Sequence, residues 1–136
     1  MAKYTYETLL DEIKPSLETL GSLSYGDKTP VSHHLKIAEN LSLIEDKAKI
    51  FLDTREKLIE DYVEKDKDGN PKKQTKEGGI VEYVLTDENR IAWQEKFEEL
   101  RQEEVEVKLN KIEKKHFEGA KELKPIYLKG IWSLLK

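Results

Sequence analysis

The chain has 136 residues, no cysteine and a formal net charge of −4 at pH 7. Its length supports one domain over residues 1–136 with a core of its own. The absence of cysteine excludes disulfides, thiolate catalysis and cysteine-ligated metal sites. Charged residues make up 38% and hydrophobic residues 37%, a balance typical of a folded, helix-rich chain. The net negative charge provides no overall attraction to nucleic acid or to anionic membranes.

Apolar residues at helical spacing predict a first helix over residues 5–20, with Thr5 as its N-cap. The inward positions are Leu9, Leu10, Ile13, Leu17 and Leu20. Pro15 lies inside this pattern, and proline removes an amide hydrogen and crowds the preceding turn. We therefore expect either a kink at this point or a second helix that begins at Pro15.

The following helix, expected over residues 32–64, carries two rows of side chains at heptad spacing. One row contains Ile37, Ile44, Phe51 and Leu58, and the other contains Leu41, Ala48, Arg55 and Tyr62. Leu52 and Ile59 are expected to widen the apolar stripe. Such a seam either packs against other helices of the same chain or forms a homo-oligomer by pairing with a second copy.

Two strands are predicted in the second half of the chain. A turn-rich charged loop over residues 65–79 precedes a β-branched and aromatic run over residues 80–86. Strict alternation over residues 104–109 indicates a half-buried strand, with Val105, Val107 and Leu109 on its apolar face. We expect these two strands to pair with each other.

Two further helices complete the prediction. The first covers residues 87–102, with Asp87 as its cap, with Ile91, Phe97 and Leu100 facing inward, and with Trp93 off the main stripe. The second is a short C-terminal helix over residues 125–135, and its apolar residues are Ile126, Leu128, Ile131, Trp132, Leu134 and Leu135. This density of apolar side chains predicts either burial or contact with a partner. The fold class is therefore α+β and mostly helical, a long-helix hairpin with a small two-stranded β element.

No motif for a catalytic or cofactor site is present. Asp66, Asp68, Asn70 and Glu77 have the spacing of a calcium loop, but Pro71 occupies the position at which that loop needs glycine, so a solvated turn is the better interpretation. His33, His34 and His116 lack metal-ligand spacing and are interpreted as surface or helix-start residues, with His34 falling on the seam. We expect no catalytic residue, no cofactor and no metal.

Charge is distributed unevenly along the chain. Residues 87–106 hold eight acidic and three basic residues, whereas residues 107–136 hold eight lysines and three acidic residues. The lysines at 108, 111, 114, 115 and 121 lack interleaved aromatic residues, so the sequence does not favour nucleic-acid binding. The candidate protein-binding residues are Glu95, Glu98 and Glu99 in an acidic strip, which continues to Glu103 and Glu104, and Ile126, Ile131, Trp132 and Leu135 near the C-terminus.

The order of these features resembles a family of small proteins encoded by tailed bacteriophages and prophages, chiefly of Gram-positive hosts. The resemblance rests on an N-terminal Leu-Leu…Pro-x-Leu-x-x-Leu, an Asp-Lys-Asp-Gly-Asn-Pro turn, a Phe-Glu-Glu-Leu helix end and Glu-Glu-Val-Glu-Val followed by Asn-Lys-Ile. It is strongest over residues 52–112. The family has no assigned activity, so the resemblance implies a phage context and no site residues.

Together these observations predict a non-enzymatic phage accessory protein that binds another protein, in virion assembly or as a minor particle component. The alternative is a small phage inhibitor of a host protein such as a defence nuclease, similar in action to an anti-CRISPR protein. Its acidic strip would then occupy a basic groove. No apolar run is long enough to span a membrane, and Met1–Leu10 lacks the apolar core of a signal peptide. The expected location is the host cytoplasm and, for a particle component, the virion.

Overall fold

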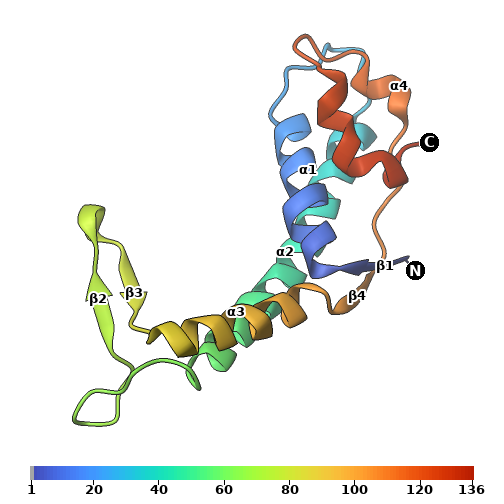
Figure 1. The fold of residues 1–136 in the computed structure, drawn as a ribbon. Helices are drawn as coiled ribbons and strands as arrows, with labels where there is room; N and C mark the ends of the chain where they lie inside the picture. Colours follow the sequence, from blue (N-terminus) through green and yellow to red (C-terminus); the bar gives the residue numbers. More distant parts are fainter. Residues whose placement is uncertain (1) are drawn as a thin grey trace. The chain divides into compact units, whose positions relative to one another are not determined.

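The computed structural model describes residues 2–136 and has a mostly helical α+β fold (Figure 1). Its elements are β1 (Ala2–Thr5), η1 (Thr8–Ile13), α1 (Lys14–Gly21), α2 (Val31–Ile59), β2 (Lys73–Thr75), η2 (Glu77–Gly79), β3 (Val81–Tyr83), α3 (Asp87–Arg101), β4 (Glu104–Val107), α4 (Lys114–Phe117) and η3 (Pro125–Leu134). The sequence predicted one domain, and the chain forms two compact units. The terminal unit comprises Met1–Lys49 and Gln102–Lys136, and the middle unit comprises Ile50–Arg101.

The sheet of the terminal unit joins β1 to β4 in antiparallel register, with Ala2 opposite Val107 and Thr5 opposite Glu104. The predicted pairing of residues 104–109 with residues 80–86 is therefore wrong. The predicted alternation is confirmed, since Val107 is buried and Val105 packs against the core, while Glu104 and Glu106 are exposed. The strand is shorter than predicted and ends at Val107.

The first helical region runs without a break from Tyr6 to Gly21. The Thr5 hydroxyl accepts a hydrogen bond from the Thr8 amide (3.1 Å), which confirms the predicted cap. A π-helical segment, η1, precedes α1, and Pro15 lies in the first turn of α1, where its missing amide hydrogen is tolerated. A new α-helix thus begins close to Pro15, but the chain stays helical across the junction.

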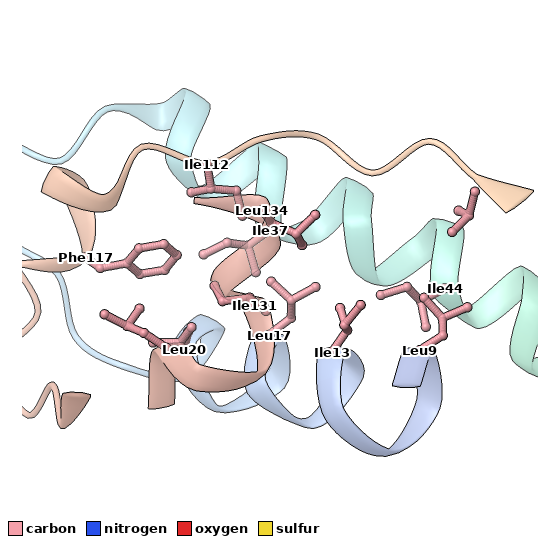
Figure 2. Close-up of a cluster of buried hydrophobic side chains, with 12 residues drawn as sticks. Leu9, Ile13, Leu17, Leu20, Ile37, Ile44, Ile112, Phe117, Ile131 and Leu134 are labelled. Carbon is pink, nitrogen blue, oxygen red and sulfur yellow. The ribbon is translucent and has the colours of Figure 1, made fainter. Parts of the chain in front are cut away.

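A single apolar core fills the terminal unit. It draws on η1 and α1, on the first half of α2, on β4, on the segment from β4 through α4 and on η3 (Figure 2). Its buried members are Leu9, Ile13, Leu17, Leu20, Ile37, Ile44, Val107, Ile112, Phe117, Leu128, Ile131 and Leu134. Leu23 and Tyr25 pack against this core from the loop between α1 and α2.

The long helix α2 ends at Ile59, five residues before the predicted end at residue 64. Ile37 and Ile44 are buried in the terminal unit, whereas Phe51 is buried in the middle unit, where its ring centroid lies 5.9 Å from that of Phe97. The chain itself therefore buries these three seam residues, as one of the two alternatives predicts. Pairing of the seam with a second copy stays a prediction. Leu52 is 52% exposed, so the predicted widening of the stripe holds for Ile59 and fails for Leu52.

The middle unit contains a hairpin that the sequence did not predict. β2 pairs antiparallel with β3, with Lys73 opposite Tyr83 and Thr75 opposite Val81. Gly78 and Gly79 form the turn with φ of +82° and +79°, a conformation that favours glycine. The predicted loop over residues 65–79 thus contains a strand, and the predicted strand over residues 80–86 is reduced to β3.

Helix α3 completes the middle unit, and its cap is Thr86 rather than Asp87, because the Thr86 hydroxyl accepts a hydrogen bond from the Asn89 amide (3.1 Å). Trp93 is buried against Ile59 and Val63 and is the largest side chain of the second core. The expectation that Ile91 faces inward is wrong, since Ile91 is 61% exposed. The helix ends at Arg101.

Candidate protein-binding surfaces

The C-terminal segment folds as η3, a 3₁₀-helical segment with a kink at Ile131 (φ −114°, ψ 17°), not as the predicted α-helix over residues 125–135. Its last residues lie beside the segment after β4. The Ile112 amide donates to the Leu134 carbonyl (2.8 Å), and the Lys136 amide donates to the Ile112 carbonyl (3.0 Å). These bonds hold the end of η3 in a defined position, with Ile131 and Leu134 in the core.

The expected binding residues of this segment separate into two groups. Ile131 is fully buried, and Leu135 is half-buried against the core, so the expectation that Ile131 contacts a partner is wrong. Trp132 is 66% exposed and Ile126 is 70% exposed. An exposed indole on a fixed segment is unusual enough to be a candidate contact, because tryptophan is enriched among the residues that dominate binding energy.

Positive charge surrounds Trp132. The Lys114 ammonium lies 5.2 Å from the centroid of the indole ring, a cation–π arrangement. Together with Leu135 and Lys136, these two residues line a shallow depression of about 260 Å³. Lys111 lies on the same side, and its ammonium donates to the Ser133 carbonyl. We call Lys111, Lys114, Trp132, Leu135 and Lys136 the Trp132 surface.

Ile126 lies in a different depression, one that it shares with Pro15, Lys129 and Gly130. Here η3 packs closely on α1, since a side-chain carbon at Gly130 would overlap Ser16 and the Glu12 carbonyl. The structure therefore places Ile126 and Trp132 on one segment but in two separate depressions.

The acidic strip of α3 is partly neutralised within the helix. Glu98 pairs with Arg101 (2.9 Å), and Glu99 pairs with Lys96 (3.5 Å). Glu95 is exposed and makes no ion pair with any residue that the structure describes. Of the three predicted acidic residues, Glu95 alone thus keeps an unshared charge for a partner.

A cluster of rings around His33 was missed by the sequence analysis. His33 is 1% exposed, and neither ring nitrogen has a hydrogen-bond partner among the described residues. Its centroid lies 4.6 Å from that of Phe117 and 4.9 Å from that of Tyr25, and the centroids of His34 and His116 are each 5.7 Å away. The sequence placed His34 on the seam, but His34 is exposed and His33 is the buried residue.

Burial sets the protonation of this cluster. Desolvation lowers the pKa of His33 to about 4, with further lowering by the positive charges of His116, His34 and Lys36. Burial also raises the pKa of Tyr25 to about 12. His33 is therefore a neutral core residue at pH 7. In the described part of the chain, no group of three or more His, Cys, Asp or Glu side chains could hold a metal ion.

The calcium-like spacing belongs to a turn, as expected. The Asp66 carboxylate accepts hydrogen bonds from the amides of Asp68 (2.9 Å) and Asn70 (3.0 Å). This is an Asx-type turn, in which an aspartate side chain bonds its own backbone.

The middle unit has a cleft of about 490 Å³ between the end of α2, the β2–β3 hairpin and α3. Tyr83 donates from its hydroxyl to Glu56 (2.8 Å), a bond that raises the pKa of the tyrosine. Arg55 lies over the Phe97 ring at 5.6 Å, and Lys73 lies over the Tyr83 ring at 5.1 Å. The cleft is amphipathic, and its polar groups are largely engaged with one another.

Among residues 2–136, no helix is both long and apolar enough to cross a membrane. Comparison of the chain with models of known protein families, with curated proteins and with solved structures finds no match.

Proposed function

We propose that this chain is a non-enzymatic accessory protein of a tailed bacteriophage. It acts by binding another protein, in virion assembly or as a minor component of the particle. The phage context comes from the sequence resemblance over residues 52–112.

The observation that carries the binding proposal is the exposure of Trp132 on a segment whose neighbouring residues form the core. Ile131 and Leu134 anchor η3, and three backbone hydrogen bonds hold its end beside residues 112–114. The backbone that carries the indole is thus held in place, so little backbone entropy is lost when a partner covers Trp132. Ile126 supplies a second exposed apolar contact on the same segment.

The test is capture of partners by the tagged protein from phage-infected cells, with mass spectrometry of the captured complex and of purified particles. Trp132→Ala and Ile126→Ala baits should each recover less of the partner than the wild-type bait. Leu35→Ala is a matched control, because Leu35 is an apolar side chain that is 53% exposed and belongs to α2 rather than to η3. This control bait should recover the wild-type amount.

Recovery of capsid, tail or baseplate proteins, with loss in the Trp132→Ala bait, supports the proposal. Recovery of a host enzyme together with absence from particles would support the alternative, an inhibitor of a host protein. That inhibitor would be expected to lose its partner on Glu95→Lys and to bind less tightly at high salt. Equal recovery by all baits would remove η3 as the contact.

A further inference from the structure

The Trp132 surface contains two lysines, Lys111 and Lys114, whose ammonium groups form no ion pair with a described carboxylate. Glu113 is the nearest acidic residue in the sequence, and it pairs with Lys115 (3.3 Å) and His116 (3.0 Å). Lys115 lowers the pKa of the Glu113 carboxyl, which therefore stays charged within that pair. Lys111 and Lys114 form no ion pair among residues 2–136, so their charges are available to an external partner.

The chain also carries a negatively charged surface that, like the Trp132 surface, has an exposed apolar side chain beside unpaired charges. On α3, Glu88, Ile91 and Glu95 are three and four residues apart, so they form one row along the helix. Ile91 is 61% exposed, and both carboxylates are exposed and unpaired in the described structure. Seven residues span roughly 10 Å of helix. We call these three residues the Ile91 row.

We propose that the Trp132 surface of one copy docks on the Ile91 row of a second copy of the chain. The indole would cover the isoleucine, and Lys111 and Lys114 would lie against the two glutamates. Each surface has an exposed apolar side chain at its centre and unpaired charges around it. The two sets of charges are opposite in sign, which favours this pairing and disfavours contact between two identical surfaces.

This contact is head-to-tail, because the two surfaces are different parts of the chain. Each copy keeps one free surface after docking, so the contact extends into a longer assembly or closes into a ring. The two patches are small, and small charged interfaces give weak, salt-sensitive association. The inference goes beyond the proposed function, because it needs no other protein.

Sedimentation velocity of the purified protein tests it, over concentrations from about 10 μM to about 1 mM. The wild-type protein should show a weight-average sedimentation coefficient that rises with concentration at low salt and rises less at high salt. Trp132→Ala should weaken association at least about tenfold. Ile126→Ala should not, since Ile126 lies in a different depression. Of these two residues, self-association should therefore depend on Trp132 alone, whereas the partner binding of the proposed function should depend on both Trp132 and Ile126.

A charge-reversal pair gives the sharper result. Glu88→Lys/Glu95→Lys makes both surfaces positive, and Lys111→Glu/Lys114→Glu makes both negative, so neither variant should associate alone. An equimolar mixture should regain the concentration dependence, because each surface again meets its opposite. Lys121→Glu/Lys124→Glu is the control, since it makes the same change of net charge at two exposed lysines outside the Trp132 surface. It should behave as the wild type.

Three results would overturn the inference. The first is a wild-type protein that stays monomeric across the whole concentration range. This outcome overturns the inference even if a single-stranded oligonucleotide or an unrelated acidic peptide binds at Trp132. The second is undiminished association of either charge-reversed variant alone. The third is a mixture that remains monomeric although both variants retain the wild-type circular dichroism and melting temperature.

Discussion

Asn40 and Asn110 are joined by reciprocal hydrogen bonds in the interior of the terminal unit. The Asn110 amide donates to Oδ1 of Asn40 (2.7 Å), and Nδ2 of Asn40 donates to the Asn110 carbonyl (3.1 Å). Asn40 is fully buried, so one side chain satisfies both backbone groups of a residue 70 positions later. This pair ties α2 to the segment between β4 and the C-terminal core.

Asn40→Ala should lower the free energy of unfolding by about 2 kcal/mol, because it leaves the amide and the carbonyl of Asn110 without partners. Asn40→Asp should be at least as destabilising at pH 7, since the buried carboxylate faces the Asn110 carbonyl with no hydrogen to donate. Urea titration measures both values. Glu39→Ala is the control. Glu39 accepts a hydrogen bond from the exposed side-chain amide of Asn110, and its loss should cost under about 0.5 kcal/mol.

Phe51→Ala should destabilise the middle unit by roughly 3–5 kcal/mol, since the Phe51 ring is 8% exposed and packs near Phe97. Leu52→Ala, one residue along α2, should change stability by less than about 0.5 kcal/mol, because Leu52 is half exposed. Chemical denaturation of the two variants checks the difference. A loss of similar size in both variants would contradict the burial of Phe51 and the exposure of Leu52 in the folded chain.

Stability should fall in mild acid because of His33. The unfolded chain binds a proton at this histidine near pH 6.5, whereas the folded chain does so only near pH 4. Above about pH 7 the side chain is neutral in both states, so its contribution is constant. Between about pH 6.5 and pH 4 the unfolded state binds more protons, and the free energy of unfolding falls by up to about 3 kcal/mol as the pH decreases.

His33→Leu should remove this part of the pH dependence. It should also raise stability at pH 7 by about 1 kcal/mol, because it replaces two ring nitrogens that have no partners with apolar carbon. Thermal melts between pH 4 and pH 8 compare the variant with the wild type. His34→Gln should leave most of the pH dependence in place, because burial is the largest cause of the lowered pKa of His33 and the charge of His34 is a smaller one.

Separate replacement of Trp132 and Leu135 should affect stability differently, because Trp132 is exposed and Leu135 packs against the core. Trp132→Ser should change the melting temperature little, because the indole is mostly exposed. Leu135→Ser should lower stability by about 1–2 kcal/mol, since Leu135 packs against the core. Equal destabilisation by the two changes would mean that the indole is covered within the folded chain.

The sequence predicted the elements that have a long and regular pattern. Four heptad positions located α2, and the buried residues Ile37, Ile44 and Phe51 confirm the seam. Strand β1 escaped prediction because four residues are too few to show a period. Strand β2 escaped because Lys-Gln-Thr is polar and exposed throughout, and only its pairing with β3 makes it a strand.

The sequence predicted the candidate binding residues of the C-terminal segment less well than it predicted the long helix. The sequence treated residues 125–135 as an α-helix, for which the dense apolar residues do not divide into faces. In the structure, η3 is 3₁₀-helical with a kink at Ile131. Leu128, Ile131 and Leu134 recur every third residue and are buried, while Ile126 and Trp132 are exposed. The three-residue spacing was visible in the sequence and would have separated Ile131 from Trp132. The proximity of Lys114 to Trp132 depends on tertiary structure and was not visible.

Gly130→Ala should be the most damaging glycine-to-alanine change in the described chain, because the contacts at Gly130 are the shortest among its glycines. At this position η3 packs so closely on η1 and α1 that a new side-chain carbon would overlap the Glu12 carbonyl and the Ser16 hydroxyl. Backbone cannot yield as a flexible side chain does, so we expect a loss of about 3 kcal/mol or more in the free energy of unfolding. Gly26→Ala is the matched control, because a side-chain carbon there meets nothing within 4 Å. A Gly130→Ala variant with the wild-type melting temperature would show that η3 does not pack on α1 at this distance, and the fixed presentation of Trp132 would then need another explanation.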